Sequence, residues 1–194
     1  IYSTFLQRAY DQIILDVCLQ ELPVVFAVDR SGIVGQDGPT HHGAFDLAYF
    51  RHIPNIILMA PKDGNELRQM LYSAYLYGRP AAIRYPRGEA RGTEPDKNFA
   101  EIPLGKWERL KEGNDFAIIA CGNTVYLSLS AAAELEEDGI QCTVINGRFI
   151  KPMDRDMLIE TANSIKRILT IEENALIGGF GSGVMEMLSD EKVD

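Results

Sequence analysis

Side chains that can bind anions or move protons concentrate in the segment 29–46, DRSGIVGQDGPTHHGAFD. Arg30 can hold a phosphate or carboxylate group through its planar guanidinium, and His41 can exchange a proton near neutral pH. Asp37 adds a carboxylate, and the glycines let the backbone approach a ligand closely. The segment therefore predicts a ligand site, although a solvated surface loop with a turn at Asp37-Gly38 is a simpler alternative.

Two further segments carry residues of similar types. Arg87 lies in RYPRG, residues 84–88, directly after a predicted strand, where an arginine suits either an anionic ligand or a surface ion pair. Tyr2, Phe5 and Arg8 follow helical spacing. Periodicity alone therefore places Phe5 in the core and Arg8 in solvent.

The glycine-rich run GGFGSG, residues 178–183, invites comparison with nucleotide-binding loops. It does not fit G-x-G-x-x-G, because Val184 stands where the last glycine should be, and it lacks the lysine of a P-loop. We interpret it as a tight turn into a closely packed helix and assign it no ligand.

The elements that must position these residues alternate along the chain. Short apolar runs predict buried strands, and apolar residues at helical spacing predict helices. The predicted strands are 24–28, 55–59, 81–85, 116–121, 142–146 and 168–172, and the predicted helices are 4–19, 45–50, 65–77, 125–137, 154–162 and 184–188. This alternation predicts an α/β protein with a mainly parallel, layered sheet, whose ligands bind at the carboxyl ends of the strands. Because the periodicity is lost between residues 88 and 103, we expect two α/β units joined by a linker.

Composition limits the function classes. The 194 residues are 46% hydrophobic and 24% charged, as in ordinary globular proteins. A net charge of -9 argues against nucleic acid or an anionic membrane as the main partner, and no apolar run approaches the length of a membrane helix. The three cysteines are far apart and surrounded by apolar residues, which predicts reduced core thiols in a cytoplasmic protein. The chain starts without Met on a helical pattern, so we expect it to be part of something longer.

Several segments together resemble the 1-deoxy-D-xylulose-5-phosphate synthase family of the transketolase superfamily. They are YSTFLQRAYDQ (2–12), the segment 29–46, RYPRG (84–88), NGRFIKPMD (146–154) and TIEENALIGGFGSGV (170–184). The resemblance implies a partial pyrimidine-binding (Pyr) domain at 1–90, a linker at 91–103 and an incomplete transketolase C-terminal domain at 104–194. It also implies that the domain binding diphosphate and Mg²⁺, and the early Pyr segment with its glutamate, are absent from this chain.

The resemblance further implies a role for individual residues. Phe5 matches the aromatic that stacks on the aminopyrimidine of thiamine diphosphate, which replaces the core interpretation of this residue. Asp37 and His41 match polar, catalytic residues over the reacting carbons, and His42 is a weaker candidate. Four residues match family residues that bind glyceraldehyde 3-phosphate, mainly at its phosphate group: Tyr2, Arg8, Arg30 and Arg87. No metal ligand is expected in this chain.

The implied activity is that of a transferase. Pyruvate and glyceraldehyde 3-phosphate would condense to 1-deoxy-D-xylulose 5-phosphate and carbon dioxide, the first step of non-mevalonate isoprenoid biosynthesis, with thiamine diphosphate and Mg²⁺ as cofactors. The family also implies a cytoplasmic homodimer, and we expect the isolated chain to be inactive. Two alternatives remain at this point: another enzyme of the transketolase superfamily, or a non-catalytic scaffold built from the same two domains.

Overall fold

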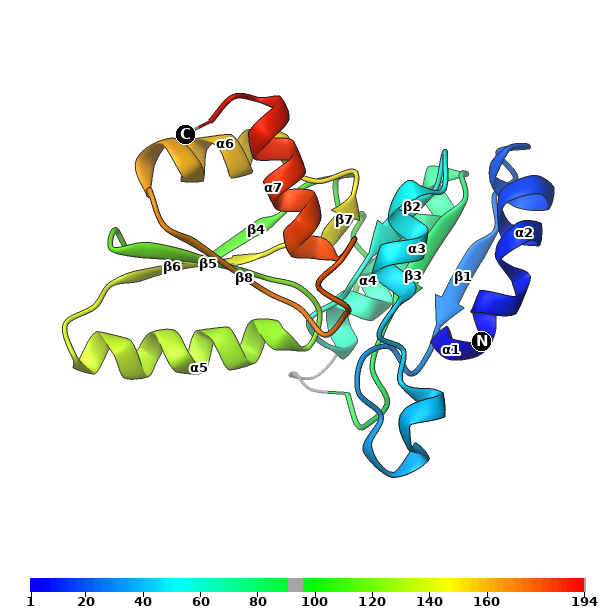
Figure 1. The fold of residues 1–194 in the computed structure, drawn as a ribbon, viewed down its shortest axis with the longest axis horizontal. Helices are drawn as coiled ribbons and strands as arrows, with labels where there is room; N and C mark the ends of the chain where they lie inside the picture. The colour runs from blue at the N-terminus through cyan, green and yellow to red at the C-terminus, as the bar shows by residue number, and fades with distance from the viewer. Residues whose placement is uncertain (91–95, 194) are drawn as a thin grey trace.

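The computed structural model describes residues 1–90 and 96–193, which form two four-stranded sheets (Figure 1). The first sheet has the order β1-β3-β2-β7 and the second β4-β6-β5-β8. The strands are β1 (Val25–Val28), β2 (Ile57–Met59), β3 (Ala81–Arg84), β4 (Glu108–Lys111), β5 (Phe116–Ala120), β6 (Cys142–Asn146), β7 (Phe149–Lys151) and β8 (Ile168–Ile171).

Helices cover both sheets. The α-helices are α1 (Ser3–Leu6), α2 (Tyr10–Gln12), α3 (Asp46–His52), α4 (Gly64–Tyr77), α5 (Thr124–Glu137), α6 (Arg155–Ser164) and α7 (Phe180–Asp190). The 3₁₀ turns η1 (Gln7–Ala9), η3 (Gly35–Asp37) and η4 (Pro39–His41) and the π-helix η2 (Ile13–Cys18) complete the set. In Figure 1, α5 lies along one face of the second sheet, and α6 and α7 lie on the other.

Both sheets are parallel except at one edge, which confirms the predicted α/β class. Strands β1, β3 and β2 run parallel, as do β6, β5 and β8. The edge strands β7 and β4 are antiparallel to their neighbours, and neither was predicted. Both are short, and β4 has the sequence ERLK, so neither carries the apolar run of a strand buried on both faces.

The predicted helix 4–19 forms as a series of short helical segments of different winding, which end at Cys18. Ala9 has non-helical dihedral angles (φ -101°, ψ 16°), and the last of these segments is the π-helix η2. Ile13 and Cys18, five residues apart, are both buried. In a π-helix each hydrogen bond joins residues five apart in sequence, so residues with this spacing, such as Ile13 and Cys18, can face the same core.

One hydrophobic core contacts both sheets, and a second, smaller cluster lies between the second sheet and α5. Phe149, in β7 of the first sheet, accepts a hydrogen bond through its carbonyl oxygen from Trp107 Nε1 (2.8 Å), and Trp107 packs edge-on against Phe180 of α7 (5.8 Å between ring centroids). All three side chains belong to the same buried cluster as the strands β2 and β3. The later half of the chain thus completes the first sheet as well as forming the second.

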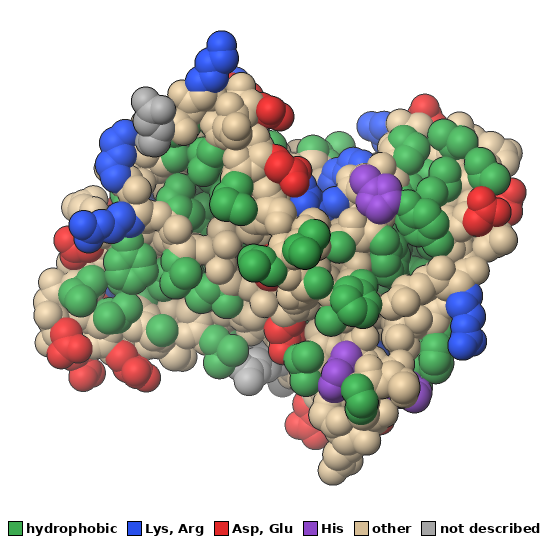
Figure 2. Space-filling model, viewed as in Figure 1, with side chains coloured by type: hydrophobic (Ala, Val, Ile, Leu, Met, Phe, Trp, Pro, Cys, Tyr) green, Lys and Arg blue, Asp and Glu red, His purple; other side chains and the backbone are tan. Residues whose placement is uncertain are grey.

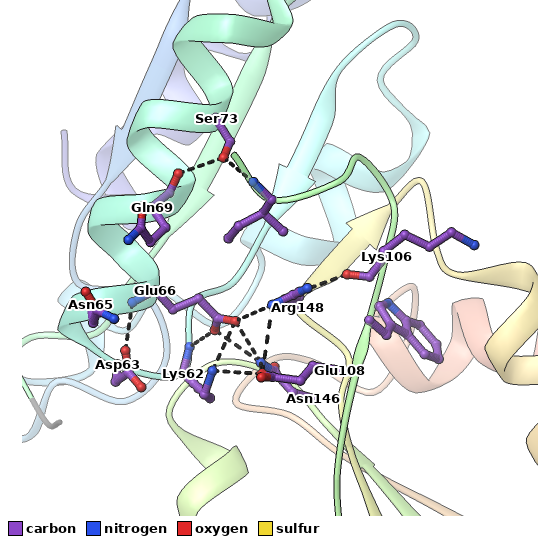
Figure 3. Close-up of polar contacts among 12 residues, drawn as sticks. Lys62, Asp63, Asn65, Glu66, Gln69, Ser73, Lys106, Glu108, Asn146 and Arg148 are labelled. Carbon is purple, nitrogen blue, oxygen red and sulfur yellow. Dashed lines mark hydrogen bonds and ion pairs between the residues drawn. The ribbon is translucent and has the colours of Figure 1, made fainter. Parts of the chain in front are cut away.

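A buried polar network also joins the two halves (Figure 3). Glu66 of α4, whose side chain is 3% exposed, accepts hydrogen bonds from Lys62 Nζ (3.3 Å), Asn146 Nδ2 (2.9 Å) and Arg148 Nη1 (3.3 Å). Lys62 also binds Glu108 of β4 at 2.9 Å. The start of α4 is therefore held against β4 and the end of β6.

The predicted linker 91–103 is described only from residue 96, since 91–95 lie outside the described residues. Its described part runs along α4. Gln69 accepts from Ala100 N (2.7 Å) and donates to Asn98 O (3.2 Å), while Ser73 Oγ accepts from Ile102 N (2.8 Å). This part of the linker is therefore packed against the first unit.

The three cysteines, Cys18, Cys121 and Cys142, are free and buried, as predicted for core thiols. Burial raises the pKa of the Cys121 thiol to about 12. Across residues 1–90 and 96–193, no helix combines the length and apolar character that crossing a membrane requires.

Candidate functional site

The first residues of the chain lie at the carboxyl end of β1. Ser3 N donates to Asp29 O (2.8 Å), and Asp29 N donates to Ile1 O (2.9 Å). This pairing brings the ring of Tyr2 beneath the guanidinium of Arg30, 3.8 Å from the ring centroid. A guanidinium over an aromatic face is an attractive contact, and it fixes the direction of the arginine fork.

The segment 30–43 is a loop closed at its base. Gly32 N donates to Gly43 O (2.9 Å), and Gly43 N donates to Gly32 O (2.8 Å). Gly43 must be glycine, because a Cβ there would lie 2.6 Å from Ser3 Oγ and closer still to the carbonyl oxygen of Arg30. Arg30 itself has a left-handed backbone (φ 58°), uncommon for a side chain of this size. The loop projects from the sheet edge as the lower lobe of the molecule, where histidine side chains reach the surface (Figures 1 and 2).

Two guanidinium groups meet one carboxylate at this edge. Asp37 accepts from Arg30 Nε (3.3 Å) and from Arg87 Nη1 (2.8 Å), and Arg30 also pairs with Asp29. Burial works against the charged form of Arg30, but Asp29, Tyr2 and Asp37 together outweigh it, and the pKa of Arg30 is raised. The loop and the end of β3, 50 residues apart, thus bring their charged groups to one place.

An aromatic surface adjoins the charged cluster. The rings of Tyr2 and Phe5 stack in parallel at 5.2 Å, and the imidazole of His41 meets Phe5 edge-on at 5.4 Å between centroids. Thr4 Oγ1 donates to Thr40 O (3.0 Å), which ties the tip of the loop to α1. Phe5 is 40% exposed, so the interpretation of Phe5 as a core residue from periodicity is wrong.

Arg8 and His42 stand apart from this cluster. Arg8 is exposed, and its guanidinium carbon is 6.0 Å from the centroid of the Phe5 ring. His42 Nδ1 accepts a hydrogen bond from Val34 N (3.2 Å), which gives His42 a structural contact within the loop. Of the seven residues singled out from the sequence, the structure gathers Tyr2, Phe5, Arg30, Asp37, His41 and Arg87, with Arg8 at the edge.

A cavity of about 640 Å³ opens beside the two arginines. The first unit contributes Arg30, Tyr85 and Arg87 to its wall, and the start of α5 in the second unit contributes Asn123 and Leu127. The cavity is large enough for a phosphorylated three-carbon sugar and lies where ligands bind in parallel α/β sheets.

The sequence analysis did not identify the buried residues that hold the site in place. Asp46 and Arg84 form an ion pair (3.2 Å) with side chains 0% and 3% exposed, and Arg84 Nη2 donates to Glu173 O (2.9 Å). Arg84 was visible as a charge inside a buried strand, a signal for a paired charge. Glu173 offered no such signal, because its contact spans 89 residues.

No group of three or more His, Cys, Asp or Glu in the described parts of the chain is arranged to hold a metal ion.

Family models match both halves of the chain. The model of the transketolase pyrimidine-binding domain matches residues 1–93, and the model of the transketolase C-terminal domain matches residues 105–194. The chain therefore belongs to the transketolase family. Among solved structures, a chain described as "Split gene transketolase, inactive beta4 tetramer" superposes with a TM-score of 0.87 at 33% identity, covering 98% of this chain and 62% of that one. A transketolase H261F mutant from Pichia stipitis gives 0.75 at 26% identity, covering 92% of this chain and 27% of that one.

Within this family, the chain is similar over its whole length to 1-deoxy-D-xylulose-5-phosphate synthases. It is 57% identical to that of Syntrophus aciditrophicus over 193 residues and 61% identical to synthase 1 of Geobacter sulfurreducens over 191 residues. These matches cover 100% and 98% of this chain and 30% of each relative. The chain thus spans about 30% of the length of these curated relatives, and the resemblance found in its motifs is confirmed.

Proposed function

We propose that this chain supplies the acceptor-binding part of a thiamine-diphosphate-dependent 1-deoxy-D-xylulose-5-phosphate synthase. The full-length protein would condense pyruvate with glyceraldehyde 3-phosphate and release carbon dioxide. The observation that carries the proposal is the convergence of Arg30 and Arg87 on one point beside the aromatic surface of Tyr2 and Phe5.

The charged cluster suits a phosphate dianion. Two guanidinium groups form strong, charge-assisted hydrogen bonds to phosphate oxygens, and Arg30 is already oriented by its contact with Tyr2. Asp37 now lies between both groups, so a bound phosphate would compete with its carboxylate. Tyr2, just before α1, and the exposed Arg8 in η1 would also bind the substrate phosphate.

The aromatic surface fits the cofactor. Phe5 is exposed while its ring is held parallel to Tyr2, so it can offer a flat apolar face to an aminopyrimidine. Thiamine diphosphate, when bound, supplies the electron sink on which pyruvate loses carbon dioxide. We place the sites for its diphosphate and for Mg²⁺ in the part of the full-length protein that this chain does not cover.

His41 has the position of a proton donor. Its imidazole lies against Phe5, and its Nδ1 is 3.0 Å from Thr40 Oγ1, so Nε2 remains to meet a substrate oxygen. A histidine side chain within hydrogen-bond reach of the substrate can pass a proton to a developing alkoxide. Asp37 would orient the arginines and a substrate hydroxyl.

We also propose the wider organisation implied by the family. Residues 1–90 would be part of a Pyr domain, 91–103 a linker and 104–194 part of a C-terminal domain, in a cytoplasmic homodimer. Two observations support inactivity of the isolated chain. It covers only a short part of its relatives, and the similar split-gene transketolase chain forms a beta4 tetramer that is described as inactive.

Steady-state kinetics of the full-length protein tests the proposal. With thiamine diphosphate, Mg²⁺ and pyruvate, we expect 1-deoxy-D-xylulose 5-phosphate from glyceraldehyde 3-phosphate. Arg87→Ala should raise the KM for this aldehyde by about ten-fold or more, since a charged hydrogen bond is worth about 1.5–3 kcal/mol. The same variant should change little with unphosphorylated glyceraldehyde, and the control Arg155→Ala on α6 should change neither. Absence of product, or equal losses with both aldehydes, would reject the proposal.

A further inference from the structure

The β8–α7 connection, residues 172–179, lies against the loop 30–43 and the residues that follow it. Ala175 N donates to Ala44 O (2.6 Å), and Asn174 Oδ1 accepts from Leu47 N (3.2 Å). A segment of the second unit thereby holds the chain just after the loop, more than 120 residues away in sequence.

Glu173 contacts the base of the loop at Gly32. Its side chain is seated on Gly32, where a Cβ would lie 2.5 Å from Glu173 Oε2 and 2.9 Å from Glu173 Cβ. Gly32 is two residues from Arg30 and forms the base of the loop with Gly43. The carboxylate also accepts from Asn123 Nδ2 (2.7 Å), in the wall of the cavity.

The main chain of Glu173 is fixed from the other side. Its carbonyl oxygen accepts from Arg84 Nη2, and Arg84 is paired with the fully buried Asp46. Asp46 in turn accepts from Ser3 Oγ (3.0 Å), next to Tyr2. One buried ion pair therefore connects Glu173 with α1, with the start of α3 and with β3, three residues before Arg87.

We propose that Glu173 is a positioning residue: it holds the base of the loop so that Arg30 stays in the wall of the cavity and Asp37 stays paired with Arg30 and Arg87. The side chain acts through its contact with Gly32 and its hydrogen bond to Asn123. Only the predicted effect of Glu173 on kinetics rests on the proposed function. The C-terminal domain would then take part in acceptor binding through Glu173.

Hydrogen exchange in the full-length protein, without substrate, tests the proposal directly. Glu173→Ala should speed amide exchange in peptides covering residues 31–45 by about five-fold, the equivalent of one neutral hydrogen bond of about 1 kcal/mol. Glu173→Gln, which keeps shape and an acceptor for Asn123, should exchange like the wild type. Glu134→Ala, the same change at an exposed position of α5, is the matched control.

Kinetics adds a second readout. Glu173→Ala should raise the KM for glyceraldehyde 3-phosphate about three- to ten-fold while kcat stays within about two-fold, and Glu173→Gln should restore the KM. Unchanged exchange in Glu173→Ala, or a Gln variant as impaired as the Ala variant, would overturn the proposal. A wild type without synthase activity would reject the proposed function. The positioning role of Glu173 would still be decided by hydrogen exchange, because exchange is measured without substrate.

Discussion

At the scale of single residues, Asp37 is the group that a phosphate bound at the proposed site would displace. It pairs with both Arg30 and Arg87, and all three side chains are partly exposed. Ion pairs of this exposure are worth up to about 1 kcal/mol each, so the site can exchange one anion for another. The carboxylate keeps the two guanidinium groups together until a ligand replaces it.

Asp37→Asn should therefore strengthen the binding of inorganic phosphate to the full-length protein by about two- to five-fold, because a competing charge is removed. Calorimetric titration with phosphate measures this. Asp138→Asn, an exposed aspartate after α5, serves as the control and should change nothing. Weaker phosphate binding in Asp37→Asn would show that the carboxylate acts only to hold the arginines in place.

The buried pair Asp46–Arg84 contributes to stability as well as to geometry. Burial alone would lower the pKa of Arg84, but the charge and hydrogen bond of Asp46 together with the charges of Cys121 and Glu173 outweigh it, and the pKa is raised. Asp46→Asn leaves a buried guanidinium without its counter-charge and should cost about 3–5 kcal/mol of unfolding free energy in urea titrations. Glu191→Gln, which breaks the more exposed pair with Arg155, should cost much less, because solvent screens that pair. Similar losses in the two variants would contradict this account.

At the scale of elements, the loop 30–43 depends on a close approach at its base. Gly43→Ala should push the loop away from Arg30 and Ser3, because the new Cβ has no space there. We expect the KM for glyceraldehyde 3-phosphate to rise at least about five-fold, whereas Gly139→Ala, which strains the backbone at φ 79° but meets no atom within 4 Å, should leave the KM unchanged. Equal KM values for both variants would show that the loop adapts.

Elements with a local signal were the ones that the sequence predicted. Strands such as β2 and β6, buried along their whole length, appear as short apolar runs, and their alternation with helices predicted the α/β class. Strands β4 and β7 form by pairing with β6 and β2, which come from other parts of the sequence. The short segments themselves contain no pattern that predicts this pairing.

The site divides in a similar way. Arg30, Asp37 and His41 share one glycine-rich loop, so their grouping was predictable, and the resemblance to a family added Tyr2 and Phe5. Their roles stay predictions. Glu173 could not be found from its surroundings in sequence, because its partners Gly32 and Asn123 come from distant segments.

At the scale of the whole molecule, the network around Glu66 responds to pH through Glu108. Burial would raise the pKa of Glu108, but its bond to Lys62 and the charges of Lys62 and Arg148 outweigh it, and the pKa lies below the usual 4.5. A carboxyl with a lowered pKa stabilises the fold above pH 4.5 and loses that contribution as the pH falls through its folded-state pKa. The stability difference between wild type and Glu108→Gln should therefore be full at pH 6 and shrink below pH 4.5 in urea titrations. A difference that stays constant down to pH 3 would contradict this assignment.

The shared core predicts that neither unit folds well alone. A chain of residues 1–103 lacks β7, so the buried edge of β2 loses its partner, and the core loses Trp107, Phe149 and Phe180. An unpaired apolar edge strand favours aggregation, and we expect 1–103 to be insoluble or polydisperse by size-exclusion chromatography. Co-expression with 104–194 should restore a soluble complex with the circular dichroism of the intact chain, because the contacts between the halves need no peptide bond across the linker. A monodisperse, cooperatively unfolding 1–103 would show instead that the first sheet is complete without β7.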